Sequence, residues 1–296
     1  MKELVVISGK GGTGKTSIVA SFATLANRKV LADCDVDAAD LHLILEPRII
    51  KREQFSGGSR ARIISELCSA CGKCEEICRF NAINSNGYDD ERVKNSYRVD
   101  PIACEGCGVC AYFCPEEAIE FAPAINGEWF VSETRCGPMV HAKLGVAEEN
   151  SGKLVTLVRS QAKEIAEKKK LDLVIIDGSP GIGCPVIASI TGSDLVLVVT
   201  EPTLSGIHDL ERISALTRHF NIPTVVCINK YDLNGELSSQ IEAKSAELNT
   251  RVVGKVRYDP AVTKAQIMKT SIVEYTGGLT SQQIQSLWRN VIYSMG

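Results

Sequence analysis

The stretch SGKGGTGKTS, residues 8–17, constrains the fold of this chain more than any other. It follows an apolar run, 4–7, and precedes a segment with apolar residues at helical spacing, 18–25. The letters GKGGTGKT fit the P-loop pattern, in which a glycine-rich turn joins a strand to a helix. Such a turn lets backbone amides approach a phosphate, which the positive end of the helix also favours. The sequence therefore predicts that Lys15 contacts the β- and γ-phosphates of a nucleotide and that Thr16 binds Mg²⁺.

A second lysine, Lys10, lies inside the same loop. The form K-G-G-x-G-K-T resembles the deviant Walker A motif of the MinD/ParA/nitrogenase iron protein superfamily of P-loop ATPases. In that group the early lysine reaches across a dimer interface to the partner's nucleotide. The resemblance implies ATP binding, slow hydrolysis, a homodimer that sandwiches the nucleotides, and catalytic roles for Lys10 and Lys15. The loop residues expected to bind nucleotide are Gly9, Lys10, Gly11, Gly12, Thr13, Gly14, Lys15, Thr16 and Ser17.

Two aspartates follow apolar runs and are predicted at the carboxyl edge of a parallel sheet, where open α/β sheets bind ligands. Asp177 ends the run 173–176 and is placed like a Walker B carboxylate, which binds Mg²⁺ directly or through water. Asp35 belongs to a D-x-D that resembles switch I of the same superfamily, where the matching residue positions the attacking water. A solvated strand end is the alternative for Asp35. The expected Mg²⁺ ligands are thus Thr16, Asp35 and Asp177.

The residues that are expected to contact the nucleotide base are predicted from the resemblance alone. Asn229 ends an apolar run, and in the superfamily an Asn at such a strand end faces the adenine amino group. The segment that contains Tyr258 and Asp259 resembles the base-flanking loop, with Arg257 where proline is common. Base contacts by Asn229, Tyr258 and Asp259 are therefore expected, with an ordinary strand-end turn as the alternative for Asn229.

Eight of the twelve cysteines form an internal repeat. Each copy reads C-x2-C-x2-C-x3-C, the spacing of bacterial ferredoxins, in which the fourth cysteine ligates the other cluster. Two [4Fe-4S] clusters are predicted. Zinc is the alternative, but zinc sites usually use two separated C-x2-C knuckles. The ligands expected for cluster 1 are Cys68, Cys71, Cys74 and Cys114, and those for cluster 2 are Cys104, Cys107, Cys110 and Cys78.

Four cysteines lie outside the repeat. Cys184 follows Asp177 by seven residues, as a cluster cysteine does in the nitrogenase iron protein. That protein needs a second cysteine near the position of Asn150, and Cys136 lies too far upstream to serve. A structural or regulatory thiol is therefore favoured over a bridging cluster. Cys34 and Cys227 lie in apolar runs and are expected to be small core residues.

Alternating strand and helix patterns predict an α/β fold with a doubly wound, mainly parallel sheet. Residues 60–122 are expected to form a small α+β bacterial-ferredoxin-like domain, inserted after the second strand. Residues 1–59 and 123–296 would then form the ATPase domain. The whole chain resembles the MinD-superfamily ATPases that carry an inserted ferredoxin domain.

Net charge and apolar content limit the partners and the cellular location that are expected for this protein. A net charge of −3 argues against a general nucleic-acid binder. No apolar run is long enough to span a membrane, and no secretory signal pattern is present, so a cytoplasmic location is expected. Membrane binding through the C-terminal helix is disfavoured, because Arg289 is its only basic residue.

Three functions compete at this point. The first is ATP-gated electron transfer to an unidentified redox or metallocluster client, by likeness to the nitrogenase iron protein. The second is assembly or delivery of iron–sulfur or other metal centres. The third is a positioning ATPase of the MinD/ParA kind, against which the weak C-terminal helix and the missing basic patch count.

Overall fold

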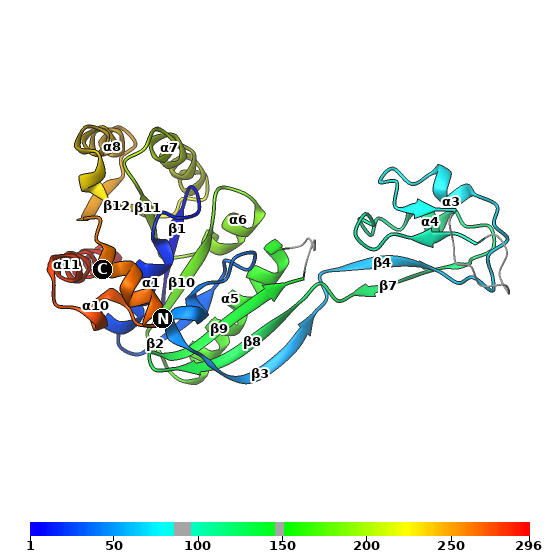
Figure 1. Ribbon diagram of the computed structural model, residues 1–296, viewed down its shortest axis with the longest axis horizontal. Coiled ribbons are helices and arrows are strands. Elements are labelled where there is room, and N and C mark those ends of the chain that lie inside the picture. Colours follow the sequence, from blue (N-terminus) through cyan, green and yellow to red (C-terminus); the bar gives the residue numbers. More distant parts are fainter. Residues whose placement is uncertain (86–95, 146–150) are drawn as a thin grey trace. The chain divides into compact units, whose positions relative to one another are not determined.

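The structure is a computed structural model that describes residues 1–85, 96–145 and 151–296 (Figure 1). The chain divides into two compact units. The first contains Met1–Glu53, Trp129–Lys143 and Ser151–Gly296, and the second contains Gln54–Glu128 and Leu144–Asn150. The predicted insert, 60–122, lies within the second unit, which begins earlier, ends later and also takes in the short stretch that starts at Leu144.

The first unit is built on one sheet, in which the described residues supply nine strands in the order β13-β12-β11-β1-β10-β2-β9-β8-β3. The neighbouring strands from β13 to β9 pair in parallel, and β1 lies between β10 and β11. The α/β fold with a mainly parallel sheet is thus confirmed. The strands are β1 (Lys2–Ser8), β2 (Lys29–Asp33), β3 (Arg48–Phe55), β8 (Gly127–Thr134), β9 (Gly137–Leu144), β10 (Leu173–Pro180), β11 (Leu195–Thr200), β12 (Thr224–Asn229) and β13 (Arg251–Val256).

Helices pack on this sheet because its central strands are apolar on both faces. Leu4 and Val6 of β1 belong to a core that includes Phe22 of the first helix and Leu287 of the last. The last helix therefore packs on the core, as its spacing predicts. The helices are α1 (Lys15–Leu25), α2 (Leu41–Leu45), α5 (Ser151–Lys168), α6 (Cys184–Ile190), α7 (Leu204–His219), η1 (Tyr231–Leu233), α8 (Gly235–Glu247), α9 (Pro260–Ile267), α10 (Ile272–Tyr275) and α11 (Leu279–Met295). Within the described residues, none of the helices is long and apolar enough to cross a membrane.

One strand of the sheet, β3, was not predicted from the sequence. The chain was expected to leave the ATPase domain after the second strand, but β3 comes first. Seven of its eight residues are exposed, since it is the edge strand of the sheet, so no apolar run marks it. Only a tight turn separates β8 from β9, which begins at Gly137, whose φ of 111° permits such a turn.

The second unit is small and its two cysteine segments fold alike. Each has a glycine with a φ near 77°, Gly72 (78°) or Gly108 (76°), followed by one short helix. Its compact core includes Ala61, Cys74 and Ile119. The elements are β4 (Gly58–Ile63), α3 (Lys73–Glu76), β5 (Ile83–Asn84), β6 (Arg98–Val99), α4 (Val109–Tyr112) and β7 (Ile119–Ala124), with β4 antiparallel to β7 and β5 antiparallel to β6.

Candidate functional site

The phosphate loop has the local geometry that its sequence predicts. β1 ends at Ser8, α1 begins at Lys15, and Gly14 between them has a φ of 88°. A Cβ atom on Gly14 would lie 2.3 Å from Nδ2 of Asn229, whose side chain donates a hydrogen bond of 2.7 Å to the Thr13 carbonyl. Gly14 is therefore required both for its backbone conformation and for the approach of Asn229.

A cavity of about 570 Å³ lies over this loop. Asp35, Arg257 and the start of α9 complete its wall, and Lys230 contributes a cation that the sequence reasoning missed. Gly9 and Lys10 are the predicted loop residues that do not line the cavity: Gly9 packs against Asp209, and Lys10 pairs with Glu201. The predicted nucleotide residues that do line it are Gly11, Gly12, Thr13, Gly14, Lys15, Thr16, Ser17, Asn229, Tyr258 and Asp259.

Lys15 is buried between two carboxylates. Its Nζ lies 2.5 Å from Oδ1 of Asp177 and 3.3 Å from Oδ2 of Asp35, and its side chain is 6% exposed. Burial lowers the pKa of Lys15, but Asp177 and Asp35 together raise it by more, so the pKa stands above its ordinary value. Lys15 is thus a fixed positive charge at the floor of the cavity.

Polar atoms without partners also lie at this place. Among the described residues, the buried Oδ2 of Asp177 and the buried Oγ1 of Thr13 have no hydrogen-bond partner. Buried polar atoms are normally satisfied, so each points to a group that completes the site. Asp177, Asp35 and Thr16 offer carboxylate and hydroxyl oxygens, the ligands that Mg²⁺ prefers. The donor set therefore fits Mg²⁺ beside a nucleotide.

Asp33 is a residue that sequence reasoning passed over. It is fully buried at the end of β2, where its carboxylate accepts hydrogen bonds from the backbone amides of Asp35 (3.2 Å) and Leu41 (3.3 Å). Burial and the charge of Asp177 raise the pKa of Asp33 well above its ordinary range. Asp33 thus fixes the backbone that carries Asp35, a role for which the D-x-D pattern was the available signal.

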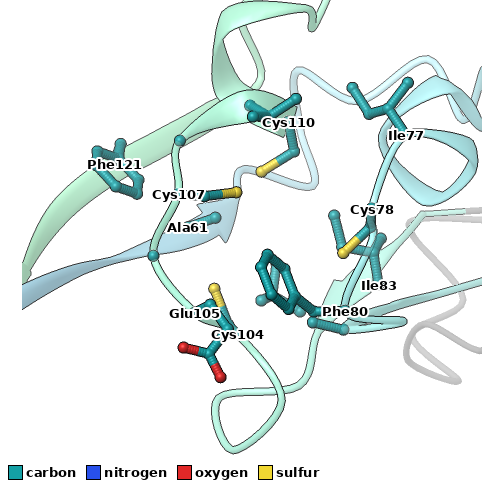
Figure 2. A pocket seen from close by; sticks show the side chains of 15 residues that line it. Ala61, Ile77, Cys78, Phe80, Ile83, Cys104, Glu105, Cys107, Cys110 and Phe121 are labelled. Carbon is teal, nitrogen blue, oxygen red and sulfur yellow. The ribbon is translucent and has the colours of Figure 1, made fainter. Parts of the chain in front are cut away.

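The eight repeat cysteines surround two separate cavities in the second unit. One is lined by Cys68, Cys71, Cys74 and Cys114, and the other by Cys78, Cys104, Cys107 and Cys110. Figure 2 shows the sulfur atoms of the second set directed toward one shared space, with Phe80 and Phe121 beside it.

These cysteines do not converge on one point. No group of three or more His, Cys, Asp or Glu in the part of the chain that the structure describes could hold a single metal ion. A [4Fe-4S] cube binds each thiolate at a different iron, so its ligands stand around a space and not around one atom. The cysteines that line each cavity offer four thiols, a donor set of the kind that such a cluster takes.

The other cysteines occupy unlike surroundings. Cys34 and Cys227 are fully buried, and burial raises the pKa of the Cys227 thiol to about 12. Both are small core residues, as expected. Cys184 is exposed at the first position of α6, Cys136 is half-buried, and the position of Asn150 lies outside the described residues.

A glycine-rich turn between a parallel strand and a helix, with a buried lysine between two carboxylates at the strand ends, defines the phosphate site of a P-loop ATPase. Residues 4–272 match the family model described as the CobQ/CobB/MinD/ParA nucleotide binding domain. The chain belongs to this family.

Two uncharacterised archaeal proteins are similar to this chain over different lengths. It is 35% identical over 242 residues to an uncharacterised protein of Methanocaldococcus jannaschii, covering 78% of this chain and 79% of that protein. It is 25% identical over 114 residues to an uncharacterised polyferredoxin-like protein of the same organism, covering 35% of this chain and 67% of that protein.

Solved structures agree on the fold. The septum site-determining protein MinD of Pyrococcus horikoshii, complexed with Mg-ADP, aligns with a TM-score of 0.59 and 15% identity, over 98% of this chain and 95% of that one. At this identity the likeness shows the fold alone.

Proposed function

We propose that this chain is an ATP-hydrolysing, dimeric iron–sulfur protein in which nucleotide state controls electron transfer to a partner protein. The main support is the lining of the two cysteine cavities. Each brings together three cysteines of one repeat copy and the last cysteine of the other, the sets that ferredoxin spacing assigns to two clusters. The polyferredoxin-like relative points the same way.

The phosphate loop supplies the chemistry of the nucleotide. A triphosphate in the cavity would compete with Asp35 and Asp177 for the ammonium of Lys15, which then stabilises the charge that builds up during phosphoryl transfer. Thr16, Asp35 and Asp177 would hold Mg²⁺. In the dimer, Lys10 would reach the nucleotide of the partner subunit.

The cysteine cavities supply the redox part. Two [4Fe-4S] clusters, when bound, would provide two one-electron carriers. Thiolates of the two cysteine sets would bind them, while Gly72 and Gly108 allow the turns between ligands. Phe80 and Phe121 also line one of the two cavities.

The deciding experiment measures cluster midpoint potentials anaerobically with Mg-ADP and with Mg-ATP. Coupling should move at least one potential by about 59 mV or more, which corresponds to a tenfold change in relative affinity for a one-electron couple. Potentials that stay unmoved would contradict nucleotide control and leave the cysteine unit a passive relay or docking surface.

One observation favours a second candidate, the delivery of clusters to a client. Cys71 and Cys107 are exposed, whereas Cys74 is buried. Exposed ligands can be attacked by thiols of an acceptor protein, since ligand exchange needs access. Transfer of iron and sulfide to a cysteine-containing apoprotein, faster with Mg-ATP, would support delivery. Clusters that stay bound through many turnovers would contradict it.

A further inference from the structure

Lys10 does not line the nucleotide cavity. Its ammonium is bound by Glu201, Thr203 and Ser205 of the same chain, which we call the Glu201 seat. Its Nζ lies 2.8 Å from Oε1 of Glu201, 3.0 Å from Oγ of Ser205 and 3.4 Å from Oγ1 of Thr203. The Lys10 side chain is 36% exposed and that of Glu201 is 15% exposed. The seat therefore holds the ammonium at a partly desolvated ion pair.

Glu201 binds a second lysine from the other side of the phosphate loop. Its Oε2 lies 2.9 Å from Nζ of Lys230, which also donates a hydrogen bond of 2.8 Å to the Gly12 carbonyl. Burial raises the pKa of Glu201, but hydrogen bonds from Lys10 and Lys230 lower it by more, so the pKa lies below its ordinary value. One carboxylate thus pairs with Lys10 of the phosphate loop and with Lys230, which also binds the loop at Gly12.

The residues that bind the Lys10 ammonium lie beside the N-terminus of α7, and this makes the negative charge of Glu201 important for holding it. Thr203 caps α7, where its hydroxyl accepts a hydrogen bond of 3.0 Å from the Gly206 amide. The first turn of a helix repels cations through its unpaired amides and the helix dipole. Two neutral hydroxyls at this end hold an ammonium poorly, so the charge of Glu201 supplies most of the attraction.

We propose that Glu201 is a positioning residue that retains Lys10 in its own subunit until a second, nucleotide-bound copy of this chain competes for it. This inference rests on the proposed ATP-dependent dimer. Lys10 cannot bind Glu201 and the phosphates of a partner subunit at the same time. The apparent affinity of dimerisation is therefore reduced, because it is proportional to the fraction of Lys10 that is free of Glu201. Glu201 therefore sets the threshold for assembly.

The test replaces Glu201 by glutamine, which keeps the size and removes the charge. Without nucleotide, the rate at which acetic anhydride modifies Lys10, followed by mass spectrometry, should rise several-fold in Glu201→Gln. With Mg-ATP, self-association measured by sedimentation should strengthen by about tenfold, the change expected when retention is lost. A double variant, Glu201→Gln with Lys10→Gln, should lose that gain.

A matched control lies on α7, the helix that follows Glu201. Glu211 of α7 pairs with Lys244 at 2.9 Å, away from the phosphate loop, and Glu211→Gln should change neither readout. Should Glu201→Gln fold poorly by thermal unfolding, Ser205→Ala removes one acceptor of the seat and should give smaller changes in the same direction.

Two results would overturn the proposal. Unchanged modification of Lys10 in Glu201→Gln would mean that Glu201 does not retain it. Faster modification together with unchanged or weaker self-association would mean that retention does not control assembly. If the wild-type chain itself stays monomeric with Mg-ATP, the proposed dimer fails, and with it the gating role, while the modification rate still decides whether Glu201 holds Lys10.

Discussion

At the scale of single residues, the electrostatics of the nucleotide site centre on Lys15. Its ammonium is almost fully buried and is balanced by Asp35 and Asp177. Removing one partner of such a buried pair leaves charges of one sign together in a region of low dielectric. Replacing Lys15 by a neutral residue is therefore expected to lower the free energy of unfolding as well as the rate of ATP hydrolysis.

We predict that Lys15→Met abolishes ATP hydrolysis and also lowers the free energy of unfolding by about 3 kcal/mol, because Asp33, Asp35 and Asp177 lose their cation. Urea denaturation without nucleotide measures this loss. The control is Lys168→Met, which breaks an exposed i,i+4 pair with Glu164 and should cost less than about 0.5 kcal/mol. Equal losses in the two variants would contradict the buried-charge explanation.

At the scale of elements, the two cysteine segments differ at one informative position. Ala70 and Gly106 each precede the second cysteine of their copy, and both have a positive φ, 57° and 62°. Only Gly106 is crowded, since a Cβ atom there would lie 2.1 Å from the Ser59 carbonyl oxygen. Contact with β4, and not φ alone, therefore requires glycine in the second copy.

We predict that Gly106→Ala lowers stability by about 2 kcal/mol or more and reduces iron incorporation, because the new Cβ clashes with backbone. Ala70→Gly is the matched control and should be nearly neutral, since relief of the left-handed conformation offsets the added chain entropy. Iron content and thermal unfolding of the two variants provide the measurement. Similar losses in both would contradict the role of the Ser59 contact.

Glu274 gives a pH-dependent prediction for the short helix α10. A hydrogen bond from Arg135 lowers the pKa of Glu274 to about 2, and Glu274 also completes the capping box with Ser271. A depressed carboxyl pKa stabilises the fold above the ordinary value of 4.5, and this contribution disappears as the pH falls toward 2.

Glu274→Gln should therefore reduce stability at pH 7 by about 1 kcal/mol, a figure discounted for partial exposure, with the gap closing between about pH 4.5 and pH 2. Chemical denaturation across that range is the measurement. Glu247→Gln, which breaks the exposed pair with Lys244, serves as the control and should show a smaller gap. A gap that persists at the lowest pH would rule out this linkage.

At the scale of the whole molecule, the two units differ in how they hold themselves together. The first has an extended apolar core under its sheet, whereas the core of the second is formed by a few residues such as Ala61, Ile83 and Ile119 among its cysteines. Small units with little apolar core usually depend on metals or crosslinks. Bound clusters should therefore stabilise the second unit and not the first.

We predict that removing iron with a chelator under reducing conditions abolishes amide protection in β4 and β7 but leaves that of β1 and β10 unchanged. Hydrogen exchange read by mass spectrometry measures both. The affinity for Mg-ATP of the iron-free chain should stay within about twofold, because the first unit keeps its own core. Loss of protection throughout the chain would show that both units fold as one.

Features that depend on local spacing could be predicted from the amino-acid sequence alone. The phosphate loop needs one strand, one glycine-rich turn and one helix, and the cysteine repeat needs only neighbouring ligands, so both are visible in short patterns. Apolar runs likewise predicted the buried parallel strands. Cluster ligands, base contacts and the dimer stay predictions.

Tertiary structure decided what distant segments bring together. Glu201 and Lys230 reach the phosphate loop from strand ends far along the chain, and Asp33 was hidden beside the more conspicuous Asp35. The edge strand β3 carries no apolar pattern, because seven of its eight residues are exposed to solvent. Pairings between distant segments are set by the packing of the whole sheet, which no local pattern records.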